Sequence, residues 1–416
     1  MSNNFLNNVM DRSGSHIHLS ETHEPHSFVM QRLPGGQVAN KKTVASAVVL
    51  QNSRDLLFSA QESTATLLSS GGSVTVRVNS GMGGICHGQT LQFTILNDGT
   101  SADLTAVPAS LMINRIEIYF NGGSQLVQTI YGDQIFLDNN MLPQEKWAGV
   151  ASVSNTGATF GIGSALADDA SITYRVPFHS IMSQCELFLG GLADDVIYKV
   201  YFHGGATKIL EDGATVPVLS DVNIILHTRD VPPATYAQMK RKYQEGFFDH
   251  PFLEVNRLEH SATYNNSTTY SQTLSAISGL VSHMWISLRA GPLDGDAMRT
   301  FQVLSSFNLY DAGGANITGL TSIPSDLNRH IQSMTHYPNT LQQNLAVYSW
   351  SHSASIMHAQ ETGANLGCYA YSGKERLDIT TAGSGDHTNG TFVLNVWAYI
   401  YRNLRINKGL AEVSQS

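Results

Sequence analysis

Two pairs of aspartates have the spacing from which a divalent-cation site could be built. Asp294 and Asp296 lie two residues apart in the stretch LDGDAM, as the first ligands of a calcium loop do. The stretch lacks the later glycine and the bidentate glutamate of an EF-hand, so a solvated Asp-Gly turn is the better interpretation. Asp168 and Asp169 stand among small residues without a strand-to-helix context, and we expect a loop there.

Histidine can ligate a metal or act as a general base, and the chain has 16 histidines. Four of them fall in one polar stretch near the start of the chain: His16, His18, His23 and His26. The first two form a His-x-His pair, which alone is a weak metal signal, and a flexible polar tail explains it better. His227 and His283 stand singly within apolar strands, so we expect each to be packed or hydrogen-bonded rather than catalytic.

Motifs that identify enzymes are absent from the sequence. It contains no H-E-x-x-H, no G-x-S-x-G, no P-loop and no G-x-G-x-x-G after a strand. Cys86, Cys185 and Cys368 are odd in number and widely spaced, so neither a disulfide framework nor a C-x-x-C metal pair is expected. Paired carboxylates of a glycosidase could still come from different strands. We predict a protein that is not an enzyme, with no catalytic residue, no cofactor and no metal.

The chain of 416 residues is long enough for about two domains and is poor in charge. Only 14% of its residues are charged, against roughly 25% in an average soluble domain, while 42% are hydrophobic. A surface with so little charge indicates that much of it is covered in an assembly. The net charge of −9 argues against a general nucleic-acid binder, which needs a basic face.

Short stretches with alternating apolar residues predict β-strands from residue 43 onward. In SVTVRVNS, the side chains of Val74, Val76 and Val78 share one face, as in a half-buried strand. Glycine, asparagine or aspartate separates the stretches, and no long helices alternate with them. The sequence therefore favours antiparallel sheets over βαβ units with a parallel sheet.

A helix is predicted from Arg229 to Gly246, where the pattern of the sequence changes. Asp230 can cap its start, two prolines suit its first turn, and Gly246 suits its end. Its apolar face is formed by Tyr236, Met239 and Tyr243. The tight basic run KRKY at 240–243 lies on this helix and is expected to be a solvated face. The helix would close the first domain and lead into the second.

The same sequence pattern occurs twice, at residues 112–123 and 303–314. Each copy has alternating apolar residues, then a tyrosine, two further residues and a double glycine. Tyr310 follows Tyr119 by 191 residues. The other aligned pairs are Ile116 with Phe307, Ile118 with Leu309, and Gly122-Gly123 with Gly313-Gly314. The glycines should lie in hairpin-like turns that need a positive φ.

The segments after each copy also correspond. A short helix is predicted after both, and in the second Leu327, Ile331 and Met334 lie at i, i+4 and i+7 with Ser325 as a possible N-cap. The closing strands share an apolar-Asn-apolar pattern at 222–224 and 394–396. A period near 190 residues is too long for a solenoid repeat of about 20–50 residues. The sequence thus predicts an all-β protein with two tandem jelly-roll β-sandwiches of about eight strands each, rather than two unrelated β domains.

The predicted chain has two tandem jelly rolls with a short helix after a middle strand of each, a helix between them and a polar arm in front. This architecture resembles the double jelly-roll major capsid proteins of tailless icosahedral viruses. The resemblance covers roughly residues 43–407, and the short loops are similar to those of bacteriophage members. It implies a homotrimer whose six jelly rolls make a pseudo-hexagonal brick in an icosahedral capsid, with minor capsid or penton proteins as further partners. The Gly/Ala/Ser-rich stretch at 139–173 departs from the family's pattern.

The resemblance and the strand pattern together divide the chain into five parts. We predict an N-terminal arm at 1–42, a first jelly roll at 43–231, a linking helix at 232–250, a second jelly roll at 251–407 and a C-terminal tail at 408–416. The arm has too little periodic apolar content to form a core, so a partner must order it. We expect it to contact a neighbouring trimer, a minor protein or, peripherally, an internal membrane through its few apolar residues, Phe5, Leu6, Val9 and Met10.

The start of the chain shows no secretory signal, and no apolar run reaches about 18 residues. We therefore expect synthesis in a host cytoplasm, followed by assembly into the virion, and no sequence-specific contact with nucleic acid. The alternative is a tandem β-sandwich binding protein, such as a lectin-like protein or a phage spike or adhesin module. A β-sandwich glycosidase ranks third.

Overall fold

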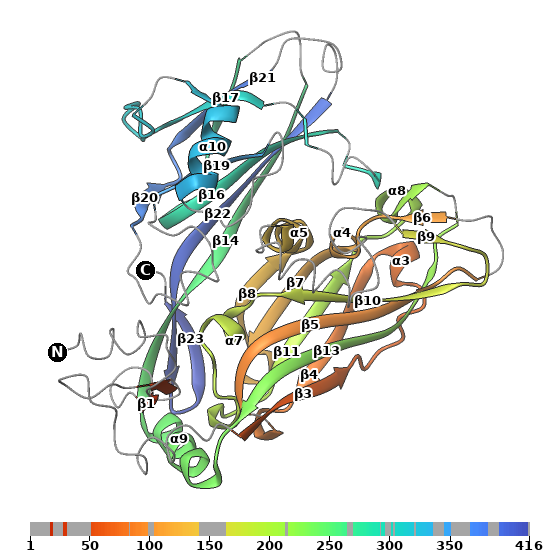
Figure 1. Ribbon diagram of the computed structural model, residues 1–416, viewed down its shortest axis with the longest axis vertical. Helices are drawn as coiled ribbons and strands as arrows, with labels where there is room; N and C mark the ends of the chain where they lie inside the picture. The colour runs from red at the N-terminus through yellow and green to blue at the C-terminus, as the bar shows by residue number, and fades with distance from the viewer. Residues whose placement is uncertain are drawn as a thin grey trace.

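The computed structural model describes most of the predicted jelly-roll region. The described residues are 17–19, 28–30, 51–82, 84–98, 104–140, 164–212, 215–263, 269–291, 293–295, 301–302, 304–319, 322–335, 345–350, 367–381 and 391–414. They form two β-sandwiches, the first at the lower right of Figure 1 and the second at its top. The predicted all-β fold class is confirmed.

The first sandwich consists of two four-stranded sheets around one core. One sheet has the order β10-β5-β13-β3, with β3 at Gln51–Ser59, β5 at Ile85–Leu96, β10 at Ser171–Phe178 and β13 at Val218–Asp230. The other has the order β4-β11-β7-β8, with β4 at Gly72–Val78, β7 at Ile113–Phe120, β8 at Gln125–Tyr131 and β11 at Val196–Phe202. A small sheet β12-β6-β9 lies at one end, with β6 at Leu104–Ala106, β9 at Ser164–Leu166 and β12 at Leu210–Asp212. The three valines predicted to share a face of β4 are fully buried.

The second sandwich repeats this arrangement. Its larger sheet has the order β14-β22-β16-β19, with β14 at Phe247–Thr263, β16 at Ser278–Ala290, β19 at Ala346–Ser349 and β22 at Thr391–Asn407. Two further strands join it, β20 at Tyr369–Ser372 beside β16 and β23 at Leu410–Ser414 beside β22. The other sheet has the order β15-β21-β17-β18, with β15 at Thr269–Thr273, β17 at Leu304–Tyr310, β18 at Ile323–Pro324 and β21 at Arg376–Thr381.

The described helices are short and join or cover the strands. Three are longer than one turn: α5 at Gly132–Asn140, α9 at Pro233–Glu245 and α10 at Ser325–Thr335. The others are α3 at Leu67–Ser70, α4 at Ala109–Met112, α7 at Ile181–Gln184 and α8 at Ala206–Ile209, with 3-10 turns η2 at Ser80–Met82, η3 at Asn121–Gly123 and η5 at Leu189–Gly191. Among the described residues, no helix combines the length and apolar character needed to cross a membrane.

The internal repeat is visible in the topology. Tyr119 lies on β7 between β11 and β8, and Tyr310 lies on β17 between β21 and β18, so the two tyrosines occupy equivalent strands. The helices α5 and α10 follow the equivalent strands β8 and β18, as predicted. The double glycines differ, however. In the first copy, Gly122 and Gly123 have φ of 65° and 100°. In the second copy, only Gly314 has a positive φ, at 87°, and the Asp311 carboxylate accepts hydrogen bonds from two N–H groups of the turn.

The linking helix starts later than predicted. Strand β13 continues to Asp230, which pairs with Arg54 at 2.8 Å instead of capping a helix, and α9 begins at Pro233. The predicted apolar face is confirmed, because Met239 and Tyr243 are fully buried. Gly246 ends the helix as predicted, and β14 follows at once.

The end of the chain was expected to be a polar tail, and this is wrong. Residues 410–414 form β23, which pairs with β22 from Asn403 to Asn407. The Asn121 side chain from the first sandwich donates to the carbonyl of Ala411 at 2.8 Å and accepts from its N–H at 2.9 Å. Five residues are too few for a sequence period to be read, and the strand forms because β22 offers an open edge.

Two predicted regions fall largely outside the described residues. In the predicted arm only β1, Ile17–Leu19, and β2, Phe28–Met30, are described, and they pair with each other in a separate sheet. His16, His23, His26 and the apolar residues near the start lie outside the described residues. In the Gly/Ala/Ser-rich stretch, α5 ends at Asn140 and β9 begins at Ser164, and residues 141–163 lie outside as well.

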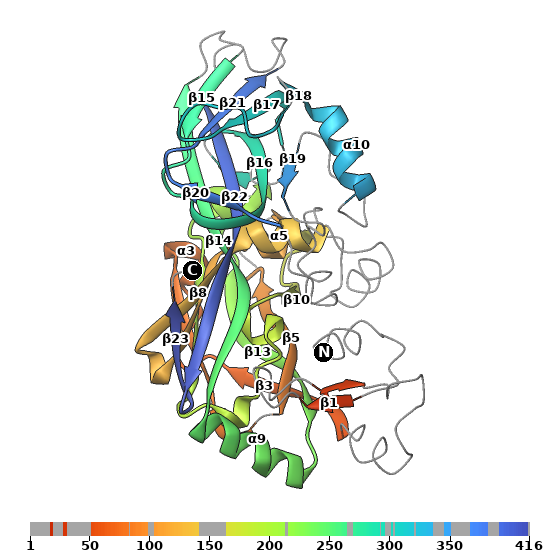
Figure 2. The same ribbon diagram turned by 90° about the vertical axis from the view of Figure 1, so that its left-hand side faces the viewer.

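The strands β14 and β22 belong to both halves of the molecule. They pair along all 17 residues of each, and Figures 1 and 2 show the pair running from the second sandwich down beside the first. Phe252 and Val255 on β14 are buried in the core of the first half, whereas Leu258 is buried in the core of the second. The two sandwiches are thus tied together by continuous strands as well as by contacts.

Gly132 shows how closely α5 approaches its neighbours. A Cβ atom there would lie 1.8 Å from the carbonyl oxygen of Ile113 and 2.4 Å from that of Ser110, and backbone cannot retreat as a flexible side chain can. We expect Gly132→Ala to lower the free energy of unfolding by about 3 kcal/mol, since overpacking against rigid neighbours costs this much. Gly81→Ala is the matched control, because nothing lies within 4 Å of its Cβ position, and should be near neutral. Denaturant unfolding measures both; equal effects would contradict the close approach.

Candidate functional site: the junction between the two jelly rolls

The aspartates considered for a cation site do not converge. Asp168 and Asp169 lie in an exposed turn between β9 and β10, where Asp169 has a φ of 57°. The carboxylate of Asp294 pairs with the Lys208 ammonium at 2.8 Å, and Asp296 lies outside the described residues. Within the described part of the chain, no group of three or more His, Cys, Asp or Glu side chains could hold a metal ion.

The two strand histidines are packed and hydrogen-bonded, as predicted. The Nδ1 of His227 lies 2.7 Å from the Asp55 carboxylate, and its Nε2 lies 2.9 Å from the Thr90 hydroxyl. His283 is buried, and its ring stacks on that of Tyr399 with centroids 4.2 Å apart. Neither geometry leaves a histidine nitrogen aimed at a substrate site.

The cysteines and the basic run differ in their exposure to solvent. Cys86 and Cys185 are buried and Cys368 is exposed, and all three are free thiols. Burial raises the pKa of the Cys86 thiol to about 12, so this side chain stays a thiol rather than a nucleophilic thiolate. Lys240 and Arg241 lie on the exposed side of α9, where Arg241 pairs with Glu245 at 3.0 Å.

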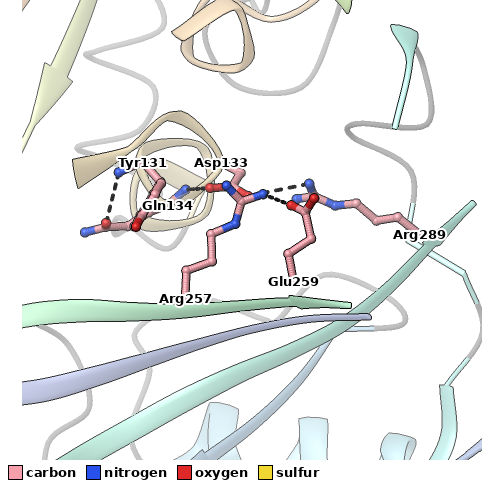
Figure 3. Close-up of polar contacts among 6 residues, drawn as sticks. All are labelled: Tyr131, Asp133, Gln134, Arg257, Glu259 and Arg289. Atoms are coloured by element: carbon pink, nitrogen blue, oxygen red, sulfur yellow. Dashed lines mark hydrogen bonds and ion pairs between the residues drawn. The ribbon is translucent and has the colours of Figure 1, made fainter. Parts of the chain in front are cut away.

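A group of paired ionisable side chains lies where the two sandwiches meet. Helix α5 of the first half carries Asp133, whose side chain is only 5% exposed. Its Oδ2 lies 3.1 Å from Nη2 of Arg257 on β14 and 3.8 Å from Nη1 of Arg289 on β16 (Figure 3). Glu259, next but one on β14, forms a second ion pair with Arg257. One carboxylate from the first half is therefore held between two guanidinium groups from the second.

Neighbouring residues hold both ends of this ion-pair cluster. Oδ1 of Asp133 accepts a hydrogen bond from the Gln134 N–H at 2.9 Å, which leaves Oδ2 directed at the arginines. The Arg257 guanidinium lies over the Tyr131 ring at 5.2 Å. Arg289 is 1% exposed and lies over the Trp397 ring at 5.3 Å. Burial lowers the pKa of Arg289 to about 10, which still leaves it charged at neutral pH.

A second polar contact crosses the junction one turn further along α5. The hydroxyl of Tyr399 on β22 donates to the Asp138 carboxylate, and the Gln134 amide donates to the same group at 3.5 Å. Part of the Asp138 residue remains accessible, but burial of its carboxyl group raises its pKa to about 7. Near neutral pH this carboxyl group is therefore divided between its protonated and ionised forms.

These polar contacts are set in an apolar interface. Trp285, Trp397 and Tyr399 lie on the face of the second sandwich's larger sheet that points away from its own core, and they are at most 2% exposed. All three belong to the hydrophobic core of the first half. This sheet is consequently buried on both faces, and the junction resembles a domain core rather than a wet cleft.

The junction can fix the relative position of the halves, because its ion pairs join side chains of both and are largely buried. Sequence reasoning named none of its charged residues as a site. The sequence feature that could have indicated them is an arginine inside an apolar strand of a chain with little charge. Arg289 lies near the end of VSHMWISLRAG, and Arg257 lies within FLEVNRLEH. Such residues are rarely buried unless they are paired.

The arrangement of the sandwiches is that of a double jelly roll, and structures with this fold are found among viral capsid proteins. PBCV-1 VP54, fitted into a cryo-EM reconstruction of the virophage Sputnik, matches with a TM-score of 0.65 at 13% identity, over 88% of this chain and 97% of that chain. The Faustovirus major capsid protein matches with a TM-score of 0.61 at 8% identity, over 98% of this chain and 99% of that chain. No protein-family model and no curated protein matches the sequence. The resemblance predicted from the sequence is thereby confirmed at the level of the fold.

Removal of the shared carboxylate should destabilise the protein strongly. Asp133→Ala leaves the buried Arg289 without this carboxylate, and breaking a buried ion pair costs about 3 kcal/mol or more in the free energy of unfolding. Arg241→Ala, which breaks the exposed pair on α9, is the control and should cost less than about 0.5 kcal/mol. Denaturant unfolding of the full chain measures both. Similar losses from the two variants would show that the junction ion pairs are not structural.

Asp138 should make stability depend on pH. Its pKa is raised from 3.8 to about 7 in the folded protein, so folding favours the protonated form, and this contribution is lost as pH rises from about 4 through 7. We expect the melting temperature of Asp138→Asn to rise relative to that of the wild-type protein as the pH increases from 5 to 8. Because the two proteins share every other titrating group, their difference isolates this carboxyl. A difference in melting temperature that is the same at pH 5, 6, 7 and 8 would contradict the assignment.

Proposed function

We propose that this chain is a structural major capsid protein that forms homotrimers of pseudo-hexagonal outline, which tile an icosahedral virion shell. The observation that carries the proposal is the likeness to the Faustovirus major capsid protein, over 98% of this chain and 99% of that chain. Because both chains are covered almost completely, the likeness concerns the tandem architecture and not a single jelly roll. A structural role also suits the junction, where Asp133 of the first half pairs with Arg257 and Arg289 of the second and all three side chains are largely buried.

The physical character of the molecule supports a building-block role. A shell subunit must keep its shape when neighbours press on it, and here two strands of 17 residues pass through both halves. The low share of charged residues suits a protein whose surface is largely covered by copies of itself. The net charge of −9 does not suit a lining that holds nucleic acid through its phosphates.

Finer features of the proposal come from the sequence and the family resemblance. Minor capsid or penton proteins would contact the trimers at special positions of the shell. The arm at 1–42 would extend to a neighbouring trimer, a minor protein or, peripherally, an internal membrane. The protein would be made in a host cytoplasm, and the short loops favour a bacteriophage-like member. The division at 43–231, 232–250 and 251–407 remains our proposal, with the helix limited to 233–245 and the second unit starting at Phe247.

Oligomeric state is the direct test. We expect size-exclusion chromatography with light scattering to give three times the 45.2 kDa chain mass at micromolar concentration, and electron micrographs of the purified protein to show pseudo-hexagonal objects or shells. Obligate interfaces bury about 2,000–5,000 Å², so the trimer should survive dilution. A stable monomer or dimer would overturn the proposal and favour the alternative, a tandem β-sandwich binding protein.

A further inference from the structure

Helix α10 presents its apolar side to solvent, which is unusual for an amphipathic helix on a sandwich. Leu327 and Ile331, spaced i and i+4, are 40% and 39% exposed. The side that faces the protein instead carries Asn328, which is 2% exposed. Its amide donates to the Val347 carbonyl at 2.6 Å and accepts from the Val347 N–H at 3.0 Å, so the helix is anchored to β19 in this orientation.

The internal repeat supplies an equivalent helix whose outer side is covered. The strand orders β4-β11-β7-β8 and β15-β21-β17-β18 correspond, so α5 after β8 is equivalent to α10 after β18. Each helix has an aspartate as its second residue, Asp133 and Asp326. Aligned on these, Gln134 corresponds to Leu327, and Asp138 corresponds to Ile331.

In α5, Asp133 of the first turn and Asp138 contact the second half of the same chain. Asp133 pairs with Arg257 on β14, and Asp138 accepts a hydrogen bond from Tyr399 on β22. Figure 2 shows α5 between the two sandwiches, whereas α10 lies at the right-hand side of the second sandwich. The equivalent surface of α10 instead keeps Leu327 and Ile331 exposed.

The surface that would cover α10 can be located by the same equivalence. The sheets β10-β5-β13-β3 and β19-β16-β22-β14 correspond, and their closing strands align at Asn223 and Asn395. Arg257 pairs with Trp397, two residues beyond Asn395 on β22. Leu57 pairs with Ile225, two residues beyond Asn223 on β13.

Leu57 on β3 is thus the equivalent of Arg257 on β14. The next residues support this register, because Phe58 and Leu258 are each buried in the core of their own sandwich. Leu57 points away from that core and is 56% exposed, the largest value among the exposed large hydrophobic side chains of the described residues. An apolar side chain occupies the place that a cation occupies in the covered surface.

We propose that α10 of one copy of this chain docks on β3 of a second copy, with Leu327 of its first turn beside Leu57 and Ile331 one turn further along the same contact. This contact between two chains is the equivalent of the contact between α5 and β14 within one chain. It rests on the proposed assembly function and identifies which surfaces of the jelly rolls meet.

Geometry and chemistry both favour a second copy as the occupant. Figure 1 shows α10 at the upper left and β3 at the bottom of the first sandwich, so one chain cannot make the contact with itself. Two different surfaces that join head to tail produce a ring when the rotation closes, as a trimer requires. The side chains also discriminate. Ile331 stands in α10 where α5 has Asp138, which accepts a hydrogen bond from Tyr399. Leu57 stands on β3 where β14 has Arg257.

Crosslinking in the full chain tests the contact. In a Cys368→Ser background, which removes the exposed thiol, Leu327→Cys and Leu57→Cys are combined and treated with a short bismaleimide. A bismaleimide is used because an aspartate–arginine pair at the equivalent place spans more than the Cβ separation of a disulfide. The control pairs Leu327→Cys with Leu126→Cys on β8, an exposed leucine at 44% that lies outside the proposed contact.

We expect covalent dimers and trimers on a denaturing gel from the Leu327/Leu57 pair and monomers from the control. Leu327→Glu and Leu57→Glu should each weaken trimer formation by about tenfold or more, because each places a negative charge in an apolar contact, while circular dichroism stays that of wild type. Trimers in solution that yield only monomers after crosslinking would overturn this contact and leave the proposed function intact. A wild-type protein that remains monomeric in light scattering would overturn both.

Discussion

The double burial of one sheet is the constraint on which the rest of the structure depends. The larger sheet of the second sandwich buries one face in its own core and the other, with Trp285, Trp397 and Tyr399, in the core of the first half. Its strand β22 accordingly has almost no polar face, and nine of its residues in a row from Phe392 to Ile400 are buried. Each large aromatic side chain buries on the order of 150–250 Å². Separating the halves would therefore expose a large apolar surface to water, which is unfavourable in free energy.

Within this apolar junction, the ion pairs determine the relative position of the two halves more than they add to the stability of the protein. A buried pair contributes little beyond what well-packed apolar side chains would, since its desolvation opposes its attraction. A wrong placement of α5 is nevertheless costly, because it would leave Asp133 or Arg289 buried without a counter-charge. The aromatic rings of Tyr131 and Trp397 beside the guanidinium groups restrict their rotamers further. The packing thus supplies most of the stability, and the charges select one arrangement.

The two jelly rolls share a topology but carry different side chains on their equivalent surfaces. On the intramolecular side, α5 and β14 meet through Asp133 and Arg257. On the free side, β3 has Leu57 in the place of Arg257, and α10 has Ile331 in the place of Asp138, and both side chains are exposed. A repeat that used the same side chains in both places would allow either helix to compete for either sheet. Different chemistry at equivalent positions gives each helix its own partner, and a tandem repeat becomes a unit with two distinct ends.

The sequence by itself determined the fold class, the tandem repeat and the helical face of α9. These depend on local periodicity, and the match of Tyr119 with Tyr310 is a comparison of two strands and their turns. It did not determine the capping of α9, because β13 continues through Asp230, nor the strand β23, which forms only because β22 has an edge for it. The tertiary structure alone decided that Asp133, Arg257 and Arg289 converge, since Asp133 lies 124 residues before the nearer arginine (257 − 133) and no period relates the three. It also decided which way α10 faces: periodicity defines an apolar side of a helix, but only the hydrogen bonds of Asn328 to β19 determine whether that side lies inside or outside.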